Sequence, residues 1–456
     1  MADDATGIEE IELDEARIEA LRGALAAGDG GAVLRLVEPL HAADIADFLE
    51  QIDAAERQAF LAIYAGEIDG DLLSEIDETI REEVIESLPA EVVADAVRDL
   101  DTDDVVDILE DLEAPAQGRI LDALDDADRV AVEQAMAYPE GSAGRLMQRE
   151  VVVAPEHWTV GEAIDFLRGA EGLPDQFYHV ILVDPRMRPL AYVTLGRILS
   201  ARREASLRDL AEESFRTVEA TEEEAEVAYI FNQYHLISCP VVDAGGRLVG
   251  VITIDDAMNV LDEEHESDML LLAGVSEEAS VLDGPFATMR QRLPWLVVNL
   301  FTASISAVVI SRFEDTIAAI VALAALMPIV ASTGGVAGTQ SLAVAVRALA
   351  ARDLTSSNAR RVVLRELAVG AMNGLALAAI IGLAAWGLFG DPWIGAVLAA
   401  AMVVNQIVAA LGGVLVPLTM DRLGLDPALA SGTFVTTLTD VMGFLAFLGF
   451  ATLVLI

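Results

Sequence analysis

The sequence predicts a multi-domain protein with an all-α helical superhelix, an α/β duplicated domain and an α-helical membrane domain with five transmembrane helices. Three observations predict this fold class. Acidic residues crowd the first part of the chain, a shift of 59 residues aligns two segments of the middle part, and long apolar stretches fill the last third.

The net charge of −47 comes from residues 1–290, which hold 67 of the 75 acidic residues and 20 of the 28 basic ones. Residues 291–456 hold 8 of each and are neutral, and every basic residue is an arginine. Such a field repels nucleic acid and attracts multivalent cations, so we expect no nucleic-acid partner. Adaptation to high salt is a second explanation of the acidity, compatible with the first. The single cysteine, Cys239, excludes an internal disulfide and fits a reducing cytosol.

Five apolar stretches follow residue 290, each long enough to cross about 30 Å of hydrocarbon as a helix. They are residues 294–311, 316–349, 367–389, 393–419 and 428–456. The second is too long for one straight span. We expect STGGVAG (332–338), which follows Pro328, to break it and to turn backbone carbonyls toward a cavity. Close helix packing through small residues is the alternative.

Arginines gather at one set of span ends, which predicts the orientation. These are Arg290, Arg292, Arg352, Arg360, Arg361, Arg365 and Arg422. The opposite ends carry only Arg312, beside two acids. We therefore expect a multi-pass protein of the cell (inner, cytoplasmic) membrane, in contact with the lipid bilayer, with a cytoplasmic N-terminal half and the C-terminus outside. The N-terminus, MADDATGIEE, has no apolar core, so we expect no signal peptide.

One carboxylate, Asp440, lies well inside an apolar stretch, VTTLTDVMGFLAF (435–447). An ionised residue at that depth costs on the order of 3 kcal/mol, and no arginine lies at a comparable depth to pair with it. An ion or proton path is therefore favoured over a buried salt bridge. Thr433, Thr436 and Asp440 share one helix face, and such oxygen ligands suit hard cations such as Mg²⁺. One aspartate makes a poor cage, so we expect a symmetric homodimer to place two of them around a hydrated ion.

The middle of the chain contains a duplication. HVILVDPRMRPLAYVTLGRIL (179–199) aligns without gaps to SCPVVDAGGRLVGVITIDDAM (238–258), and each copy is typical of strand, turn, strand and helix. This resembles a tandem pair of CBS modules, which commonly sense nucleotides or ions. In the second copy Thr253 and Asp256 could hold an adenosine ribose, whereas the first copy has Arg197 in the position of Asp256. A nucleotide site and a purely structural pair are both open.

Acidic helices flank the duplication. HAADIADFLEQID, LPAEVVADAVRDLD and DTDDVVDILEDLE share one pattern within residues 17–140, which predicts a superhelix of helix pairs. Asp103, Asp104 and Asp107 crowd one helix start, where acids also serve as caps. Residues 254–278 are predicted to form one long acidic helix leading toward the membrane. Facing acidic surfaces repel unless cations bridge them, which describes a two-state gate.

Six motifs carry a family resemblance: HAADIADFLE (41–50), YPEGSAGRLM (138–147), GVITIDDAM (250–258), RLPWLVVNL (292–300), MPIVASTGGVAGTQSLAVAVRALA (327–350) and DPALASGTFVTTLTD (426–440). From about residue 34 to its end, the chain resembles the MgtE-type magnesium channel family. The resemblance implies a homodimer with five parts. They are an acidic helical N domain (1–140), CBS module 1 (141–203), CBS module 2 (204–262), a plug or connecting helix (263–290) and a five-helix transmembrane domain (291–456).

The resemblance also implies a function: a Mg²⁺-selective channel that imports Mg²⁺ down its electrochemical gradient and closes when cytosolic Mg²⁺ binds between the N domain, the CBS modules and the plug helix. It implies that Asp440 is the pore carboxylate and that Gly335 and Gly338 lie beside the ion path. Five residues resemble regulatory metal ligands: Asp103, Asp107, Asp256, Glu264 and Asp268.

The sequence departs from the family pattern in places. Val336 replaces a usual asparagine. Asn259 and Ser267 replace frequent acids, so either the affinity or the number of the sensing sites is expected to differ. The first CBS module has VTLGR where an SLRD-like sequence is common, which argues against ATP as a cofactor.

Two other functions stay open: a secondary transporter or exchanger of divalent cations, and a membrane-anchored Mg²⁺ sensor without transport. We expect no enzyme activity, because the sequence has no nucleophile–base arrangement, no phosphate loop and only 5 histidines.

Overall fold

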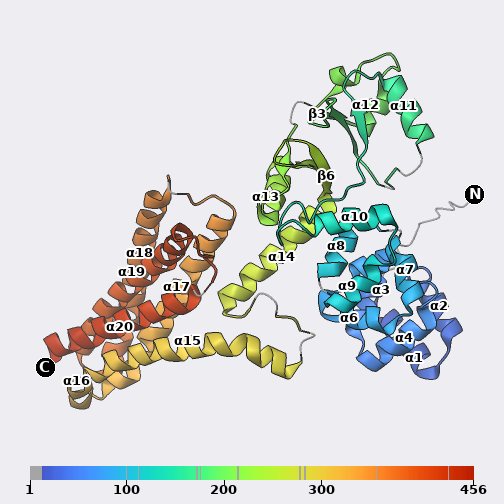
Figure 1. Ribbon diagram of the computed structural model, residues 1–456. Helices are drawn as coiled ribbons and strands as arrows, with labels where there is room; N and C mark the ends of the chain where they lie inside the picture. Colours follow the sequence, from blue (N-terminus) through green and yellow to red (C-terminus); the bar gives the residue numbers. More distant parts are fainter. Residues whose placement is uncertain are drawn as a thin grey trace, which may run out of the picture. The chain divides into compact units, whose positions relative to one another are not determined.

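The computed structural model describes residues 13–456 except 99, 111, 171–172, 175, 213–214, 277–278, 282–283, 356 and 430. The chain folds as two compact units, Met1–Glu264 and His265–Ile456, which are described separately (Figure 1). The first unit contains the helical array and the duplicated α/β modules. The second contains the long apolar helices. These parts confirm the predicted fold class.

The helical array consists of short helices joined by turns of a few residues. They are α1 (Glu15–Ala27), α2 (Gly30–Val37), α3 (Ala42–Gln51), α4 (Ala54–Tyr64), α5 (Gly70–Glu75), α6 (Glu78–Ser87), α7 (Ala90–Arg98), α8 (Thr102–Glu110), α9 (Ala114–Leu121) and α10 (Asp126–Ala135). Many of these helices are preceded by an aspartate that caps the first turn. Asp53, for example, accepts hydrogen bonds from the backbone N–H groups of Ala55 and Glu56. The apolar face of each helix is buried, and Phe48 and Phe60 meet edge to face in the core at 5.5 Å between ring centroids.

Two α/β modules follow. Their elements are β1 (Val153–Pro155), α11 (Val160–Gly169), β2 (His179–Val183), β3 (Pro189–Thr194), α12 (Leu195–Ser200), the 3₁₀ helix η1 (Leu207–Leu210), β4 (Val218–Glu219), α13 (Glu224–Tyr234), β5 (Ser238–Val242) and β6 (Leu248–Thr253). The strand orders are β1-β2-β3 and β4-β5-β6, each with one parallel and one antiparallel pair.

The register of the two sheets repeats the predicted duplication. His179 pairs with Thr194 in the first sheet, and the equivalent Ser238 pairs with Thr253 in the second. The two copies also meet at this point, because His179 Nδ1 lies 2.5 Å from Ser238 Oγ, 59 residues further along the chain. Burial lowers the pKa of His179 to about 4, so the imidazole is neutral at pH 7.

A long helix, α14 (Ile254–Ala273), leads out of the second module. It ends five residues before the end predicted for it, because Gly274 adopts a left-handed φ of 74° and stops the helix. The helix predicted over residues 254–278 and the plug helix predicted over 263–290 are therefore shorter than expected. Residues 277–278 and 282–283 lie outside the described part of the chain.

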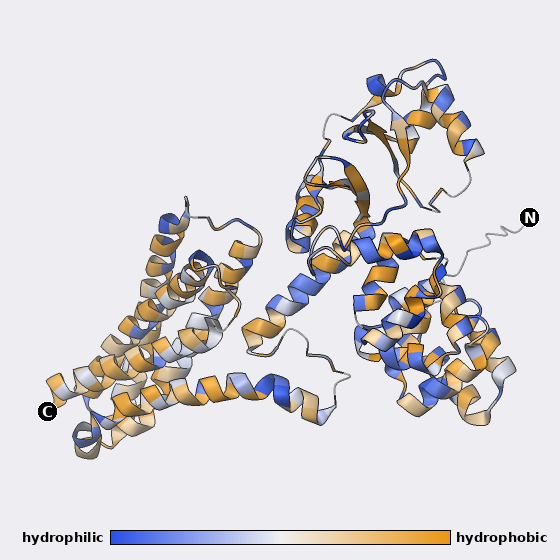
Figure 2. Cartoon of the chain, in the orientation of Figure 1, coloured by the Kyte–Doolittle hydropathy of each residue, from blue (hydrophilic) through white to orange (hydrophobic). Residues whose placement is uncertain are grey.

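The second unit contains α15 (Pro285–Ser311), α16 (Glu314–Ala319), α17 (Ala322–Ala350), α18 (Ala359–Phe389), α19 (Pro392–Arg422) and α20 (Ser431–Leu455). Within the described residues, five helices are long and apolar enough to cross a membrane: α15, α17, α18, α19 and Gly432–Leu455 of α20. Figure 2 shows their apolar residues in orange along most of their length. Helix α19 packs against α17, α18 and α20 and is the most buried of the five.

The break predicted within residues 332–338 is wrong. Helix α17 stays helical through all seven residues, and the second apolar stretch is divided instead at Ile320 and Val321, between α16 and α17. The glycines serve close packing, which was the alternative. A Cβ on Gly338 would lie 2.6 Å from Val435 Cγ1 of α20, so the two helices approach as closely as only glycine allows.

Candidate functional site

Asp440 lies in the middle of α20 and is partly buried. Among the described residues, its side chain forms no hydrogen bond and no ion pair. The salt-bridge interpretation is therefore not supported in this part of the chain. The threonines beside it are already satisfied as donors: Thr436 Oγ1 donates to the carbonyl of Gly432 at 2.8 Å, and Thr439 Oγ1 donates to that of Thr436 at 2.8 Å. Their oxygen lone pairs remain available as acceptors or ligands.

The structure brings both predicted pore glycines onto the same stretch of α20. A Cβ on Gly335 would lie 3.7 Å from Thr436 Cγ2, and one on Gly338 would lie 3.5 Å from Thr439 Cγ2. This stretch is the helical turn that immediately precedes Asp440. The glycine face of α17 and the carboxylate-bearing helix α20 are thus direct neighbours.

The membrane domain holds further buried polar groups that the sequence analysis missed. Glu366 was placed outside the third apolar stretch, but α18 begins at Ala359 and includes it. Its carboxylate is buried and accepts a hydrogen bond from Ser341 Oγ of α17 at 3.2 Å. Asp440 is therefore not the only carboxylate within the membrane helices. Asn405 and Gln406 of α19 are also buried, and two amides inside the apolar run AMVVNQIVAA were the available signal.

In the first unit, two helix starts bring acids together. Asp103 and Asp104 lie in the first turn of α8, and Asp255 and Asp256 lie in the first turn of α14. Helix α8 is anchored there by Glu150, which accepts hydrogen bonds from Thr102 N at 3.3 Å and Thr102 Oγ1 at 2.7 Å.

These carboxylates oppose one another's ionisation. Burial, followed by repulsion from Asp256, raises the pKa of Asp104 to about 7 and that of Asp103 well above its usual range. Burial and the charge of Asp255 raise the pKa of Asp256 to about 7, although Thr253 Oγ1 donates a hydrogen bond to its carboxylate at 2.8 Å. Asp101 contributes to the same repulsion. We call Asp101, Asp103, Asp104, Asp255 and Asp256 the acidic cluster; Asp101, Asp104 and Asp255 were not in the predicted set.

Asp107, a predicted ligand, has a different environment. Its carboxylate pairs with Arg81 Nη1 at 2.9 Å, and the arginine is buried. Glu264, another predicted ligand, lies near Glu224, whose pKa is raised by burial and by the charges of Glu110, Glu264 and Asp107. No three His, Cys, Asp or Glu side chains within the described ranges converge closely enough to hold a metal ion. The acids are gathered, but they do not form a preformed cage.

The remaining predicted ligand, Asp268, belongs to the second unit. Burial and the charge of Asp426 raise its pKa, and His265 acts in the opposite direction. Close to it, the last turns of α14 pack onto α17 and α20, because Leu271 shares an apolar cluster with Leu342 of α17 and Val435 of α20. A Cβ on Gly432 would lie 3.3 Å from the carbonyl oxygen of Leu272. The end of α14 therefore contacts the helices that carry Gly338 and Asp440.

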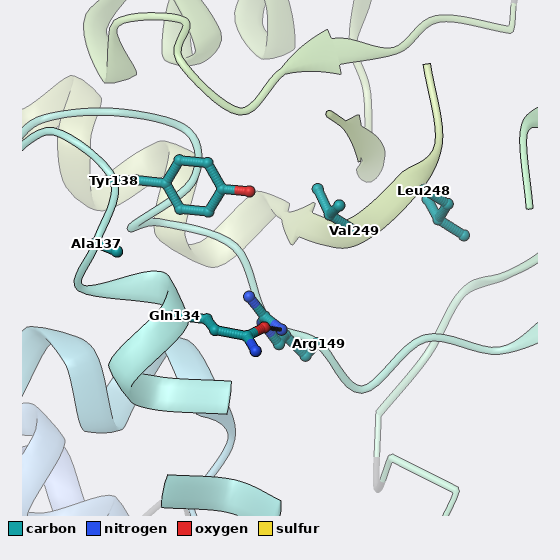
Figure 3. A pocket seen from close by; sticks show the side chains of 6 residues that line it. All are labelled: Gln134, Ala137, Tyr138, Arg149, Leu248 and Val249. Carbon is teal, nitrogen blue, oxygen red and sulfur yellow. Dashed lines mark hydrogen bonds between the residues drawn. The ribbon is translucent and has the colours of Figure 1, made fainter. Parts of the chain in front are cut away.

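Thr253, one of the two residues predicted to hold a nucleotide, lines a narrow cleft between the two modules, whereas Asp256 does not. Thr253, His179 and Ser238 are among its walls, and its cavity volume is about 20 Å³, which admits a water molecule but no nucleoside. A cavity of about 490 Å³ lies elsewhere in the first unit and is lined by Gln134, Ala137, Tyr138, Arg149, Leu248 and Val249 (Figure 3). There Arg149 Nη1 donates to Gln134 Oε1 at 2.8 Å. None of the predicted site residues lines this larger cavity.

Comparison with known proteins identifies the family. The model of the MgtE divalent cation transporter matches residues 327–450, that of the MgtE intracellular N domain matches 40–141, and that of the CBS domain matches 143–204 and 207–263. The magnesium transporter MgtE of Thermus thermophilus is 35% identical over 340 residues, which are 74% of this chain and 75% of that protein. This chain belongs to the MgtE family.

A second curated relative and a solved structure are also similar to this chain. The magnesium transporter MgtE of Bacillus subtilis is 29% identical over 332 residues, 73% of this chain and 74% of that protein. The crystal structure of the cytosolic domain of the Mg²⁺ channel MgtE in complex with ATP is 29% identical and covers 53% of this chain and 99% of that one, with a TM-score of 0.49. The family assignment makes this chain a multi-pass membrane protein with a helical N domain and a CBS pair.

The site residues distribute over the matched MgtE regions. Gly335, Gly338 and Asp440 lie within the divalent cation transporter region, residues 327–450. Asp103 and Asp107 lie within the N domain region and Asp256 within the second CBS region. Glu264 and Asp268 fall between the matched regions, in the part of α14 that leads to the membrane domain.

Proposed function

We propose that this MgtE-family chain is a Mg²⁺-selective channel that imports magnesium down its electrochemical gradient as a homodimer. The observation that carries the proposal is Asp440, a carboxylate on a membrane-spanning helix without a bonded partner among the described residues, beside the glycine face of α17. An unpaired charge at that depth is costly unless a cation or water meets it. Two symmetry-related copies of Asp440 would hold a hydrated Mg²⁺ through its water shell.

The proposed orientation places the first unit in the cytoplasm and the C-terminus outside. Arg352, Arg360, Arg361 and Arg365 all follow α17 or begin α18, on the side reached by the end of α14. Arginine excess marks cytoplasmic span ends. The acidic cluster would then sample cytosolic Mg²⁺.

We further propose that cytosolic Mg²⁺ closes the channel through α14. The first turn of α14 carries two members of the acidic cluster, and its last turns contact α17 and α20. Divalent ions would relieve the repulsion among the carboxylates and favour one arrangement of α8 and α14. Because α14 is one continuous helix, that arrangement would be transmitted to the ends of the pore helices.

Replacing Asp440 tests the pore assignment. Asp440→Asn keeps the size of the side chain and removes its charge, and we expect Mg²⁺ flux into proteoliposomes to fall at least tenfold while the dimer still forms. Asp421→Asn, which changes an exposed carboxylate at the end of α19, is the matched control and should leave flux unchanged. Undiminished flux in Asp440→Asn with an intact dimer would refute the proposal.

Two alternatives have their own signatures. A secondary exchanger would use Asp440 to carry protons in turn, so its Mg²⁺ flux would depend on the pH gradient, whereas channel current follows the Mg²⁺ electrochemical gradient alone. A sensor without transport would give no flux in proteoliposomes under any gradient. Single-channel recording identifies a channel, and proteoliposome flux with and without a pH gradient separates an exchanger from a sensor.

A further inference from the structure

Two adjacent amides, Asn405 and Gln406, lie at the centre of the membrane domain. They occupy the middle of α19, and their side chains are 0% and 2% exposed. Amide side chains are costly in such a setting unless their hydrogen bonds are made. The contacts of these two side chains therefore show what holds them there.

Both amides donate to the backbone of α17 just before and within the glycine-containing turn. Asn405 Nδ2 donates to the carbonyl of Val330 at 2.7 Å, and Gln406 Nε2 donates to the carbonyl of Thr333 at 3.2 Å. These carbonyls lie about one helical turn apart, four residues and one residue before Gly334. Helix α19 thus holds α17 by its backbone at the level of the predicted ion path.

Asn405 also separates α17 from α20. A Cβ on Gly334 of α17 would lie 2.3 Å from Asn405 Nδ2, and a Cβ on Gly443 of α20 would lie 3.0 Å from Asn405 Oδ1. The amide therefore fills the space between two glycines that face it from different helices. Gly443 is three residues beyond Asp440, so Asn405 contacts the turn that follows the carboxylate.

One atom of this arrangement is unpaired. Asn405 Oδ1 is buried and has no hydrogen-bond partner among the described residues. An unsatisfied buried acceptor costs more free energy than an average hydrogen bond within a membrane protein contributes. Packing alone would favour leucine, which has nearly the same volume and no unsatisfied oxygen. The amide is better explained by its donor group, which fixes where α17 lies.

We infer that Asn405 is a positioning residue for the ion path, with Gln406 as its second donor. By holding the Gly334–Gly338 turn of α17 at a fixed distance from α20, it sets the width available to the hydrated ion beside Asp440. The inference rests on the proposed channel function and adds a determinant of cation selectivity. Asn405 is inaccessible to solvent, so it acts on the ion path through α17.

Selectivity separates a positioning role from a merely structural one. The Mg²⁺ to Ca²⁺ flux ratio of the full-length dimer in proteoliposomes is compared for wild type, Asn405→Leu and Gln406→Leu, with melting temperatures measured on the same samples. Asn373→Leu is the matched control, because it makes the same change at an exposed position of α18. We expect the ratio to fall about tenfold in Asn405→Leu, which corresponds to about 1.4 kcal/mol, less in Gln406→Leu and not in the control.

An unchanged flux ratio in Asn405→Leu would overturn the inference, whatever happens to the melting temperature. If that variant does not fold, Gly334→Ala replaces it, because the added Cβ would displace the same amide; an unchanged ratio there is equally decisive. The two proposals fail separately. Retained flux in Asp440→Asn refutes the pore assignment, whereas unchanged selectivity in Asn405→Leu refutes only the positioning role.

Discussion

Asp256→Asn is expected to stabilise the first unit at pH 8 and to weaken its response to Mg²⁺. Burial and mutual repulsion raise the pKa values of Asp104 and Asp256 from 3.8 to about 7. A carboxyl group with a raised folded-state pKa contributes stability below its unfolded pKa, and that stability is lost as the pH rises through the folded pKa. The wild-type protein should therefore lose stability between about pH 4 and pH 7.

The size of the effect follows from the pKa of Asp256. A difference of about 3 pH units, at 1.36 kcal/mol for each, gives a loss of about 4 kcal/mol for full ionisation, counted once because the neighbouring carboxylates share the same repulsion. Asparagine does not ionise and can still accept the hydrogen bond from Thr253 Oγ1. It also removes the neighbouring charge that raises the pKa of Asp104 most strongly, so the pKa of Asp104 should fall.

Mg²⁺ should replace protons as the stabilising cation. At pH 8 the wild-type cluster is ionised, and Mg²⁺ at a hundred times its dissociation constant would restore about 2.7 kcal/mol. At pH 5 the carboxylates are largely protonated, so added Mg²⁺ should do little. In Asp256→Asn the stabilisation by Mg²⁺ at pH 8 should be smaller, because one carboxylate of the acidic cluster has been replaced by an uncharged amide.

Thermal unfolding of the full-length protein at pH 5 and pH 8, with and without Mg²⁺, measures these shifts. About two of the three pH units fall between pH 5 and pH 8, which corresponds to about 3 kcal/mol. A domain of this size changes its melting temperature by roughly 2–4 °C per kcal/mol, so about 5–10 °C is expected between the two pH values. Glu19→Gln, at an exposed position of α1, is the control. The reasoning is refuted if melting temperatures are equal at both pH values, or if NaCl at matched ionic strength protects as well as Mg²⁺ does.

Two further changes test the packing and the sensing residues. Gly338→Leu should abolish Mg²⁺ flux and lower the free energy of unfolding by about 1–3 kcal/mol, because even its Cβ would meet Val435. Gly387→Leu, at a position with open space, is the control and should change neither flux nor thermal unfolding. Asp107→Asn should weaken the Mg²⁺-dependent protection from proteolysis less than Asp256→Asn does, because Arg81 already pairs with Asp107; an equal or larger loss would contradict that ranking.

The sequence predicted the duplication and the membrane helices because both leave periodic or compositional signals. His179 and Ser238, which align in the sequence, occupy equivalent positions in the register of the two sheets. The apolar stretches form helices long enough to cross a membrane. Asp440 could be found because a carboxylate is rare in such a stretch. The glycines of residues 332–338 were misinterpreted for a physical reason. Glycine weakens a helix and also permits close helix contact, and only the positions of α19 and α20 decide between the two effects.

The acidic cluster could be found only in part. With 67 acids in the first 290 residues, composition does not tell which ones are buried together. Asp104 and Asp255 become neighbours because Glu150 anchors the start of α8 and because α14 begins directly after β6. Asp107 lies about one turn after Asp103 in the same helix, yet its carboxylate pairs with a buried arginine of α6. Tertiary contacts of this kind leave no local pattern.

Asp440 in the membrane domain and the acidic cluster in the first unit are expected to respond to cations in different ways. Asp440 alone cannot enclose Mg²⁺, so in the proposed channel discrimination would come from the spacing of rigid helices, which buried amides such as Asn405 are suited to fix. In the first unit the carboxylates repel one another and form no cage, so their response to Mg²⁺ depends on how many are ionised together. Selectivity should therefore be sensitive to single uncharged substitutions near α17. Sensing should change gradually as successive acids are neutralised, because each carries only part of the shared repulsion.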